Sequence, residues 1–332
     1  IYRGFHALKQ SIRRRRPTLA ILIDFPDIHF KLAAELKRLG IPVIFFVSPQ
    51  LWAWKKHRIK LVQKYIDHML VIFSFEEPFY RERGVQAEFV GHPLADLPAP
   101  AATREEFAAA TGLAENGRWI ALLPGSRAKE IHTNLPEMLK AARILSPKGK
   151  FEFIVPLAPT LNHAQRNMTL NIIARHGGGL PIRTATDARA ALKFARVSVV
   201  ASGTATVEAA LIGNPFVVVY RVSPLTYAIA KRFVKVPHVA MANLIAGKRV
   251  VPELIQNEFT ALNIVKNVAP LLPEGEARQS MKEELQRIRT SLEAHQEGGE
   301  LKRRGAIDRV AEIVLQQLGV SSAEQTMHAS LR

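Results

Sequence analysis

The segment "LLPGSRAKEI", residues 122–131, brings together three residue types that suit the binding of an anion. An apolar run stops at Pro124, and Gly125, Ser126 and Arg127 follow it. Glycine permits a close approach to the backbone, and the planar guanidinium of arginine presents a fork of donors to phosphate oxygens. Alone, the triplet is weak evidence for a site, because an ordinary surface turn that contains an arginine has the same composition.

A second candidate for anion binding is "VSVVASGTATVEAALIG", residues 197–213, which predicts a strand, a turn of small residues and a helix. We expect the free N–H groups of Ser202, Gly203 and Thr204, at the positive end of the helix dipole, to form an anion site. Glu208 falls one turn into the helix, where a carboxylate could reach the hydroxyl pair of a ribose. The alternative is simple N-capping by Ser or Thr, but a cap does not require the small residues beside it.

A carboxylate and a histidine in the first part of the chain also follow predicted strands. In "LIDFPDIHF", Asp24 stands at the carboxyl end of a strand and is a candidate general base. Asp27 is better explained as a cap of the next helix. In "GHPLAD", His92 follows a later strand, although a lone histidine is more often structural than catalytic.

Two tryptophans stand beside a basic run in "VSPQLWAWKKHRIK", residues 47–60. The residues concerned are Trp52, Trp54, Lys55, Lys56, Arg58 and Lys60. The tryptophans could belong to a core. Beside lysine and arginine, they also suit a membrane interface, where amphipathic rings lie at the level of the headgroups.

The composition limits the classes to which the protein can belong. Its 332 residues, 48% of them hydrophobic, are enough for two domains with their own cores. There is no cysteine, which excludes disulfides and thiolate chemistry, and no apolar run long enough to span a membrane, so we expect a cytoplasmic protein. The net charge of +17 favours an anionic partner such as nucleic acid, anionic lipid or a phosphorylated substrate, unless the basic faces are merely solvated.

The elements that must position these residues alternate between strands and helices. In the first part, strands are expected at 19–24, 42–47, 69–73 and 87–90, with helices at 28–40, 55–66 and 76–84. The Pro/Ala-rich stretch 97–103 indicates a linker. A second series of strands is expected at 119–124, 151–157, 181–184, 197–202 and 215–220, and from about 253 onward the sequence predicts helix, including an amphipathic stretch at 305–318.

Nearly all-apolar strands that alternate with helices predict an α/β fold with two Rossmann-like domains, each built on a parallel sheet, facing a cleft. We expect an N-terminal domain over 1–97 and a C-terminal, nucleotide-binding domain over 98–300. A helix within 301–320 is expected to pack back on the N-terminal domain, and residues 321–332 to form a disordered tail.

Seven motifs, in this order, make the chain resemble the lipid-A-disaccharide synthases, a family of GT-B glycosyltransferases. They are "LIDFPDIHF", "VSPQLWAW", "FVGHPLAD", "LLPGSRAKEI", "ASGTATVEAAL", "VVVYRVSPLTYAIAKRFVK" and "MANLIAGKRVVPELIQ". The resemblance covers about residues 1–320. Members of the family open with a strand and a glycine-rich turn that this sequence does not show, so we expect the first domain to be incomplete.

The resemblance implies an inverting glycosyl transfer from UDP-2,3-diacylglucosamine to 2,3-diacylglucosamine 1-phosphate (lipid X), with release of UDP. It makes Asp24 the base, Arg127 the group that stabilises the departing diphosphate, and Asn243 a residue near the donor. It assigns nucleotide binding to Gly125, Ser126, Ser202, Gly203, Thr204, Thr206 and Glu208. It requires no metal and no cofactor, because Arg127 and a helix N-terminus supply the positive charge.

The partners implied by the resemblance are the two lipid substrates, a second copy of the chain in a homodimer, and an anionic membrane surface. The protein would then be peripheral, on the inner face of the cytoplasmic membrane, with Trp52, Trp54, Lys55, Lys56 and Arg58 on the membrane and acceptor side. UDP-sugar 2-epimerases share this architecture and are an alternative. A nucleic-acid-binding protein would explain the charge but not Asp24, Arg127 or the turn at 202–208, so no nucleic-acid partner is expected.

Overall fold

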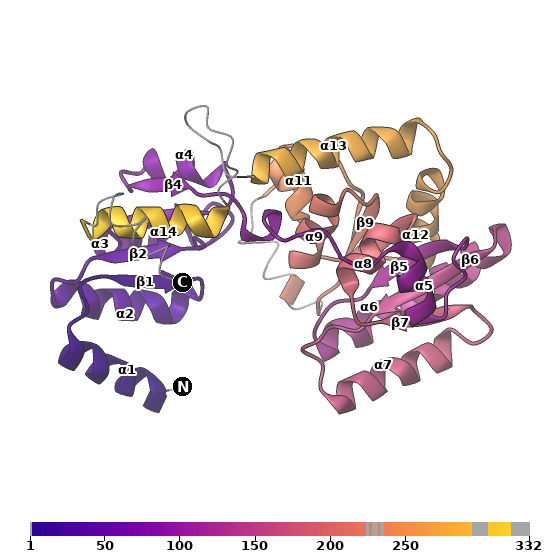
Figure 1. The fold of residues 1–332 in the computed structure, drawn as a ribbon, viewed down its shortest axis with the longest axis horizontal. Coiled ribbons are helices and arrows are strands. Elements are labelled where there is room, and N and C mark those ends of the chain that lie inside the picture. The colour runs from indigo at the N-terminus through magenta and orange to yellow at the C-terminus, as the bar shows by residue number, and fades with distance from the viewer. Residues whose placement is uncertain (1, 224–225, 228–231, 233–235, 294–304, 320–332) are drawn as a thin grey trace. The chain divides into compact units, whose positions relative to one another are not determined.

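A computed structural model describes residues 2–223, 226–227, 232, 236–293 and 305–319 (Figure 1). The chain divides into two compact units. Among the described residues, the first unit contains 2–96, 291–293 and 305–319, and the second contains the remainder. Each unit is built around its own parallel sheet, as the sequence predicts.

The first unit has a four-stranded parallel sheet in the order β1-β2-β3-β4. Its strands are β1 (Ala20–Ile23), β2 (Val43–Phe46), β3 (His68–Val71) and β4 (Ala87–Phe89). Its helices include α1 (Tyr2–Arg15), α2 (Pro26–Arg38), α3 (Ile59–Tyr65) and α4 (Glu76–Arg81), with short 3-10 turns at Lys56–Arg58 and Pro93–Ala95. All four strands predicted from apolar runs are therefore confirmed.

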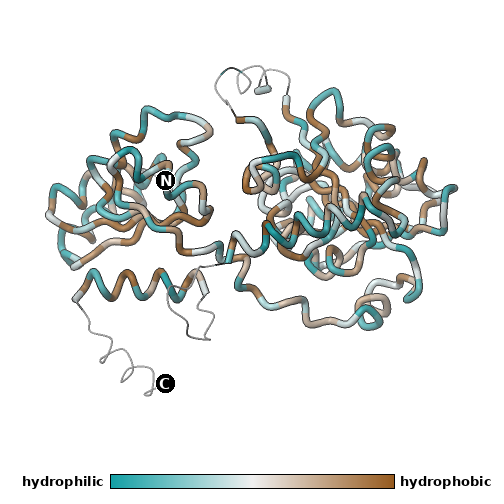
Figure 2. Tube along the Cα trace, turned by 90° about the horizontal axis from the view of Figure 1, so that it is seen from above, coloured by the Kyte–Doolittle hydropathy of each residue, from teal (hydrophilic) through white to brown (hydrophobic). Residues whose placement is uncertain are grey.

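The core of the first unit lies between this sheet and α2, which packs against β1 and β2. Hydrophobic residues run along the strands at the centre of the unit (Figure 2). Because side chains alternate along a strand, Leu22 of β1 is buried with Phe30 and Phe45, whereas Ile21 and Ile23 point to the opposite face. There they are 41% and 56% exposed, so β1 leaves an apolar face uncovered among the described residues.

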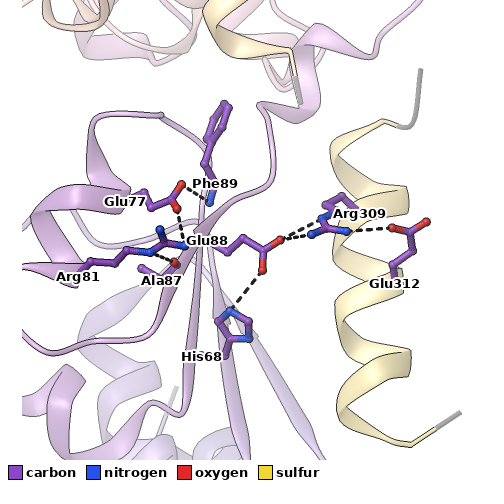
Figure 3. Close-up of polar contacts among 8 residues, drawn as sticks. All are labelled: His68, Glu77, Arg81, Ala87, Glu88, Phe89, Arg309 and Glu312. Atoms are coloured by element: carbon purple, nitrogen blue, oxygen red, sulfur yellow. Dashed lines mark hydrogen bonds and ion pairs between the residues drawn. The ribbon is translucent and has the colours of Figure 1, made fainter. Parts of the chain in front are cut away.

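Helix α14 (Ala306–Gln317) belongs to the first unit although it is distant in sequence. Its Arg309 donates from Nε and Nη2 to one carboxylate oxygen of Glu88 on β4, at 2.9 and 2.6 Å (Figure 3). The backbone N–H of Ala306 donates to Asp96 at 2.6 Å. Val310 and Ile313 are buried on its apolar face. The expected disordered tail at 321–332 lies outside the described residues.

The second unit has a six-stranded parallel sheet in the order β10-β9-β8-β5-β6-β7. Its strands are β5 (Arg118–Leu123), β6 (Phe151–Pro156), β7 (Ile182–Ala185), β8 (Val197–Ala201), β9 (Phe216–Tyr220) and β10 (Glu253–Ile255). Its described helices are α5 (Arg104–Thr111), α6 (Ala128–Leu145), α7 (His163–His176), α8 (Ala188–Phe194), α9 (Thr204–Ile212), α11 (Met241–Ala246), α12 (Ala261–Val268) and α13 (Glu276–Leu292), the last two residues of which fall in the first unit. Further 3-10 turns lie at Ser146–Lys148, Gln256–Glu258 and Ala269–Leu271.

One part of the second unit differs from the sequence prediction. Residues 253–255 were expected to begin a helical region, but they form β10, which pairs in parallel with β9. The three-residue strand is too short to show an alternating pattern, and only its pairing with Val218–Tyr220 defines it.

Candidate functional site

The strand order of the second unit places its two candidate anion-binding segments side by side. In the strand order, β6 and β7 follow one another to one side of β5. The chain then returns, and β8 pairs with the opposite side of β5. Leu123 of β5 pairs with Val200 of β8. Gly125–Arg127 and Ser202–Thr204 therefore follow the carboxyl ends of two neighbouring strands. This is the topological switch point, where ligands bind in open α/β sheets.

The turn after β5 is organised by an acidic residue, Glu130, that no sequence pattern singles out. Glu130, in the first turn of α6, accepts hydrogen bonds through Oε2 from the backbone N–H groups of Ser126 at 3.1 Å and Arg127 at 3.3 Å. Gly125 has a φ of +116°, and a Cβ there would come within 2.4 Å of the same carboxylate. The close approach that requires glycine here is therefore an approach to Glu130, and nucleotide binding by Gly125 stays a prediction.

Arg127 projects from this turn with most of its side chain in solvent. The side chain is 80% exposed, and its Nη1 donates to Glu130 Oε1 at 2.8 Å. A guanidinium held at one nitrogen keeps its other donors directed outward, where they can bind the oxygens of a phosphate. The position at the N-terminus of the long helix α6 adds the positive end of a helix dipole.

The turn after β8 fits the anion-site prediction only in part. The N–H of Ser202 donates to Val219 in the sheet at 2.9 Å, so it is not free, and the prediction is wrong for this group. Thr204 and Ala205 are the first two residues of α9, where backbone N–H groups have no acceptor within the helix. Gly203 has a φ of +144°, and apart from its chain neighbours no described atom lies within 4 Å of a Cβ built there. Gly203 and Thr204 are both exposed, so the start of α9 lies at the surface of the unit.

The other two residues predicted on α9 differ in exposure. Thr206 is fully buried, and its hydroxyl donates to the Gly203 carbonyl at 2.7 Å, so it shapes the turn from inside. Glu208 is half-buried. Burial raises the pKa of its carboxyl group, and the nearby charge of Arg189 opposes that change. Glu208 is the acidic residue of α9, and its contact with a ribose stays a prediction.

Asn243 lies inside the fold and not at a surface. Its amide nitrogen donates to the Val251 carbonyl at 2.9 Å and to Glu253 at 2.8 Å, and its oxygen accepts from the N–H groups of Val250 and Val251. The side chain is fully buried, and both ends of the amide are occupied. The structure thus gives Asn243 a role in fixing the loop between α11 and β10, and its position near the donor stays a prediction.

In the first unit, Asp24 occupies a strained turn at the carboxyl end of β1. Asp24 and Phe25 have φ values of 51° and 49°, and Val47, at the end of the neighbouring β2, has 65°. Left-handed conformations of residues other than glycine cost of order 1–3 kcal/mol each and concentrate at functional sites. The Asp24 carboxylate is exposed, and its backbone carbonyl accepts a hydrogen bond from His29 Nδ1 at 2.6 Å.

Asp27 does not cap α2, so that prediction is wrong. The cap residue is Phe25, which makes no side-chain cap bond. The Asp27 carboxylate instead pairs with Arg58 at 2.5 Å and with Lys55 at 3.9 Å. The hydrogen bond from Arg58 lowers the pKa of Asp27. Asp27 thereby ties the start of α2 to the basic segment after β2.

The two tryptophans of that segment point in different directions. Trp52 is half-buried, and its Nε1 donates to Glu76 at 3.0 Å, whereas Trp54 is 45% exposed with the Lys55 ammonium 4.1 Å from its ring centre. Glu76, also overlooked in the sequence, is buried and accepts from the Ser48 hydroxyl at 2.7 Å as well. Burial raises the pKa of Glu76 to about 7, against the effect of these hydrogen bonds.

His92 is a structural residue in this fold. It is buried, its Nδ1 accepts the backbone N–H of Leu94 at 3.1 Å, and the backbone N–H of His92 donates to the Leu292 carbonyl at 2.8 Å. Burial lowers its pKa to about 4, so the ring is neutral at physiological pH. Within the described residues there is no group of three or more His, Cys, Asp or Glu arranged for a metal ion, and no helix long and apolar enough to cross a membrane.

Sequence comparison finds one family along nearly the whole chain. A family model described as lipid-A-disaccharide synthetase matches residues 2–308. The lipid-A-disaccharide synthase of Acidobacterium capsulatum is 58% identical over 301 residues, which cover 88% of this chain and 75% of that protein. The corresponding protein of Koribacter versatilis is 47% identical over 294 residues, which cover 89% and 76%.

Comparison with solved structures finds the same architecture at low identity. A UDP-GlcNAc 2-epimerase from Neisseria meningitidis, bound to UDP-GlcNAc, aligns with a TM-score of 0.58 and 12% identity, over 96% of this chain and 80% of that one. An α,α-trehalose 6-phosphate synthase from Burkholderia multivorans aligns with a TM-score of 0.56 and 15% identity, over 97% and 76%. At this level of identity the likeness establishes the GT-B fold alone.

Proposed function

The chain belongs to the lipid-A-disaccharide synthase family, glycosyltransferases of lipid A biosynthesis, and from this premise we propose that it joins UDP-2,3-diacylglucosamine to 2,3-diacylglucosamine 1-phosphate (lipid X). The products are lipid A disaccharide 1-phosphate and UDP. The observation that carries the proposal is that the Gly125–Arg127 and Ser202–Thr204 turns follow the paired strands β5 and β8 at the switch point.

In the proposed reaction, the 6-hydroxyl oxygen of the acceptor attacks the anomeric carbon of the donor. Asp24 takes the hydroxyl proton as the new C–O bond forms. The bond from the anomeric carbon to the diphosphate breaks, and UDP leaves with the electron pair. Arg127 and the open N–H groups at the start of α9 would stabilise the charge that develops on the diphosphate, so the protein supplies this stabilisation through its own groups.

The proposed reaction is tested with the purified full-length protein and both substrates. We expect one disaccharide and one UDP for each pair of substrates consumed, measured by mass spectrometry and by a coupled assay for UDP. Omission of the acceptor should abolish UDP release. A protein that forms no disaccharide, or that converts UDP-GlcNAc to an epimer instead, would contradict the proposed function.

We also propose that the segment around Trp54 binds the anionic membrane surface in which both lipid substrates reside. Trp54 is exposed beside Lys55, and Lys56 and Lys60 are exposed close to it in sequence. Lys55 and Arg58 form ion pairs with Asp27. Lys56 and Lys60 are therefore the lysines of this segment to replace in a test of membrane binding. A homodimer, and a location on the inner face of the cytoplasmic membrane, remain predictions from the family.

Replacing Lys56 and Lys60 together with glutamine should weaken binding to anionic vesicles by about 2 kcal/mol, or about 30-fold, because each charge near the surface contributes about 1 kcal/mol. Co-sedimentation with vesicles that contain 30 mol% or so of anionic lipid measures the change. The matched control replaces Lys148 and Lys150, two exposed lysines of the second unit, with glutamine. Equal effects of the two pairs would mean that only overall charge matters and that this patch is a solvated face.

A further inference from the structure

Glu130 is an acidic residue that bonds directly to both the backbone and the side chain of a proposed site residue, Arg127. One carboxylate oxygen accepts the backbone N–H groups of Ser126 and Arg127, and the other accepts Nη1 of the Arg127 guanidinium at 2.8 Å. A single side chain therefore holds both the main chain and the side chain of Arg127. The proposed reaction gives Glu130 no role.

The local geometry is built to bring this carboxylate against the turn. Gly125 adopts a φ of +116°, and a Cβ there would lie 2.4 Å from Oε2 and 2.7 Å from Cβ of Glu130. Any other residue at this position would displace Glu130 and would also be strained. Glycine at 125, arginine at 127 and glutamate at 130 thus form one unit of structure.

The carboxylate also accepts two backbone N–H groups of this turn that would otherwise be free to bind a phosphate. The N–H groups of Ser126 and Arg127, at the positive end of α6, point at Glu130. A ligand phosphate at this turn could not then use these two backbone N–H groups, and the exposed guanidinium of Arg127 is a charged donor that projects from the turn toward solvent. An exposed arginine has many rotamers, and a guanidinium fixed at one end loses less entropy when it binds.

We propose that Glu130 is a positioning residue that aims Arg127 at the diphosphate of the nucleotide, an inference that rests on the proposed function of Arg127. Glu130 makes no contact with the ligand in this role. It acts through Arg127 alone, by fixing the turn and one nitrogen of the guanidinium. Its removal should therefore matter only when Arg127 is present.

A double-mutant cycle in the full-length protein tests this role. It compares the wild type, Glu130→Gln, Arg127→Ala and the double variant, with calorimetry for the Kd of UDP and initial rates for disaccharide formation. We expect Glu130→Gln to raise the Kd of UDP about 10-fold and to lower kcat about 10- to 100-fold, with the donor KM changed less than about two-fold. The effect on binding should be larger for UDP than for the donor, because UDP is the leaving group itself and carries its full negative charge.

In the Arg127→Ala background, Glu130→Gln should change neither quantity by more than about two-fold, because interacting residues are not additive. The control Glu115→Gln removes the same charge from an exposed site of the same unit, and it should leave both quantities unchanged. Melting temperatures of all variants separate loss of fold from loss of alignment.

Each contrary outcome has its own meaning. Additive losses would overturn the proposal and give Glu130 an independent role, and tighter binding of UDP by Glu130→Gln would show that the carboxylate competes with the ligand. A wild type that does not bind UDP would overturn the positioning role itself. A wild type that binds UDP but forms no disaccharide would refute the proposed reaction, and the Kd values alone would still decide the role of Glu130.

Discussion

Replacing Asp24 with asparagine should slow disaccharide formation by about 10²- to 10⁴-fold, the usual contribution of a general base. The amide keeps the size of the side chain but cannot take the proton of the acceptor hydroxyl. The affinity for UDP should change less than about two-fold, because the proposed base acts on the acceptor and lies in the other unit from Arg127. Single-turnover rates and calorimetry with UDP measure the two quantities.

Asp27→Asn is the matched control for this prediction, since it makes the same change three residues further on. Asp27 is engaged by Arg58 and Lys55, and exposed ion pairs of this kind contribute little to stability. We expect its turnover to stay within a few-fold of the wild type. Near-normal turnover by Asp24→Asn, with a large loss in Asp27→Asn, would reassign the base to Asp27.

Replacing Arg127 with lysine should lower kcat about 10²- to 10³-fold although the positive charge is retained. Removal of one preorganised donor to a developing anion typically has a cost of this order. Lysine cannot reproduce a planar fork that is held by Glu130 at one nitrogen and free at the others. The comparison of kcat with the donor KM is the measurement, because the lost interaction belongs mainly to the transition state.

The matched control for Arg127 lies at the opposite end of the same strand. Arg118→Lys makes an identical substitution at an exposed residue that begins β5 and stacks on Phe151. It should leave turnover within about two-fold and lower the melting temperature only slightly. Full activity of Arg127→Lys would instead show that Arg127 is an ordinary surface residue.

Most of the fold could be predicted from the sequence because buried parallel strands are continuous apolar runs. "LAILID" and "PFVVVY" each contain a strand of the structure, β1 and β9. The strand β10 was missed because three residues carry no periodic signal and the pairing with β9 is non-local. The adjacency of β5 and β8 was likewise beyond a local pattern, since the paired residues Leu123 and Val200 are 77 positions apart.

Candidate site residues could be picked out from the sequence where residue type and strand end coincide, and were missed where a side chain turns back on its own loop. Arg127 and Gly203 fall at strand ends, which the sequence shows directly. Glu130 belongs to an ordinary charged helix start in the sequence, and only the carboxylate geometry connects it to Gly125. The motif that contains Asn243 could be found in the sequence. That the side chain points into the fold and makes four hydrogen bonds there is visible only in the structure.

The ion pair between Glu88 and Arg309 has a consequence for the order in which the protein matures on the ribosome. The two residues are 221 positions apart, and at about 5–20 residues per second the second is synthesised roughly 10–40 s after the first. The whole of the second unit, which ends at Thr290, emerges in that interval. Of the two units, the first is therefore the first to begin synthesis and the last to be completed. Strand β4 is made before the helix α14 that it bonds, and the second unit can fold in the meantime.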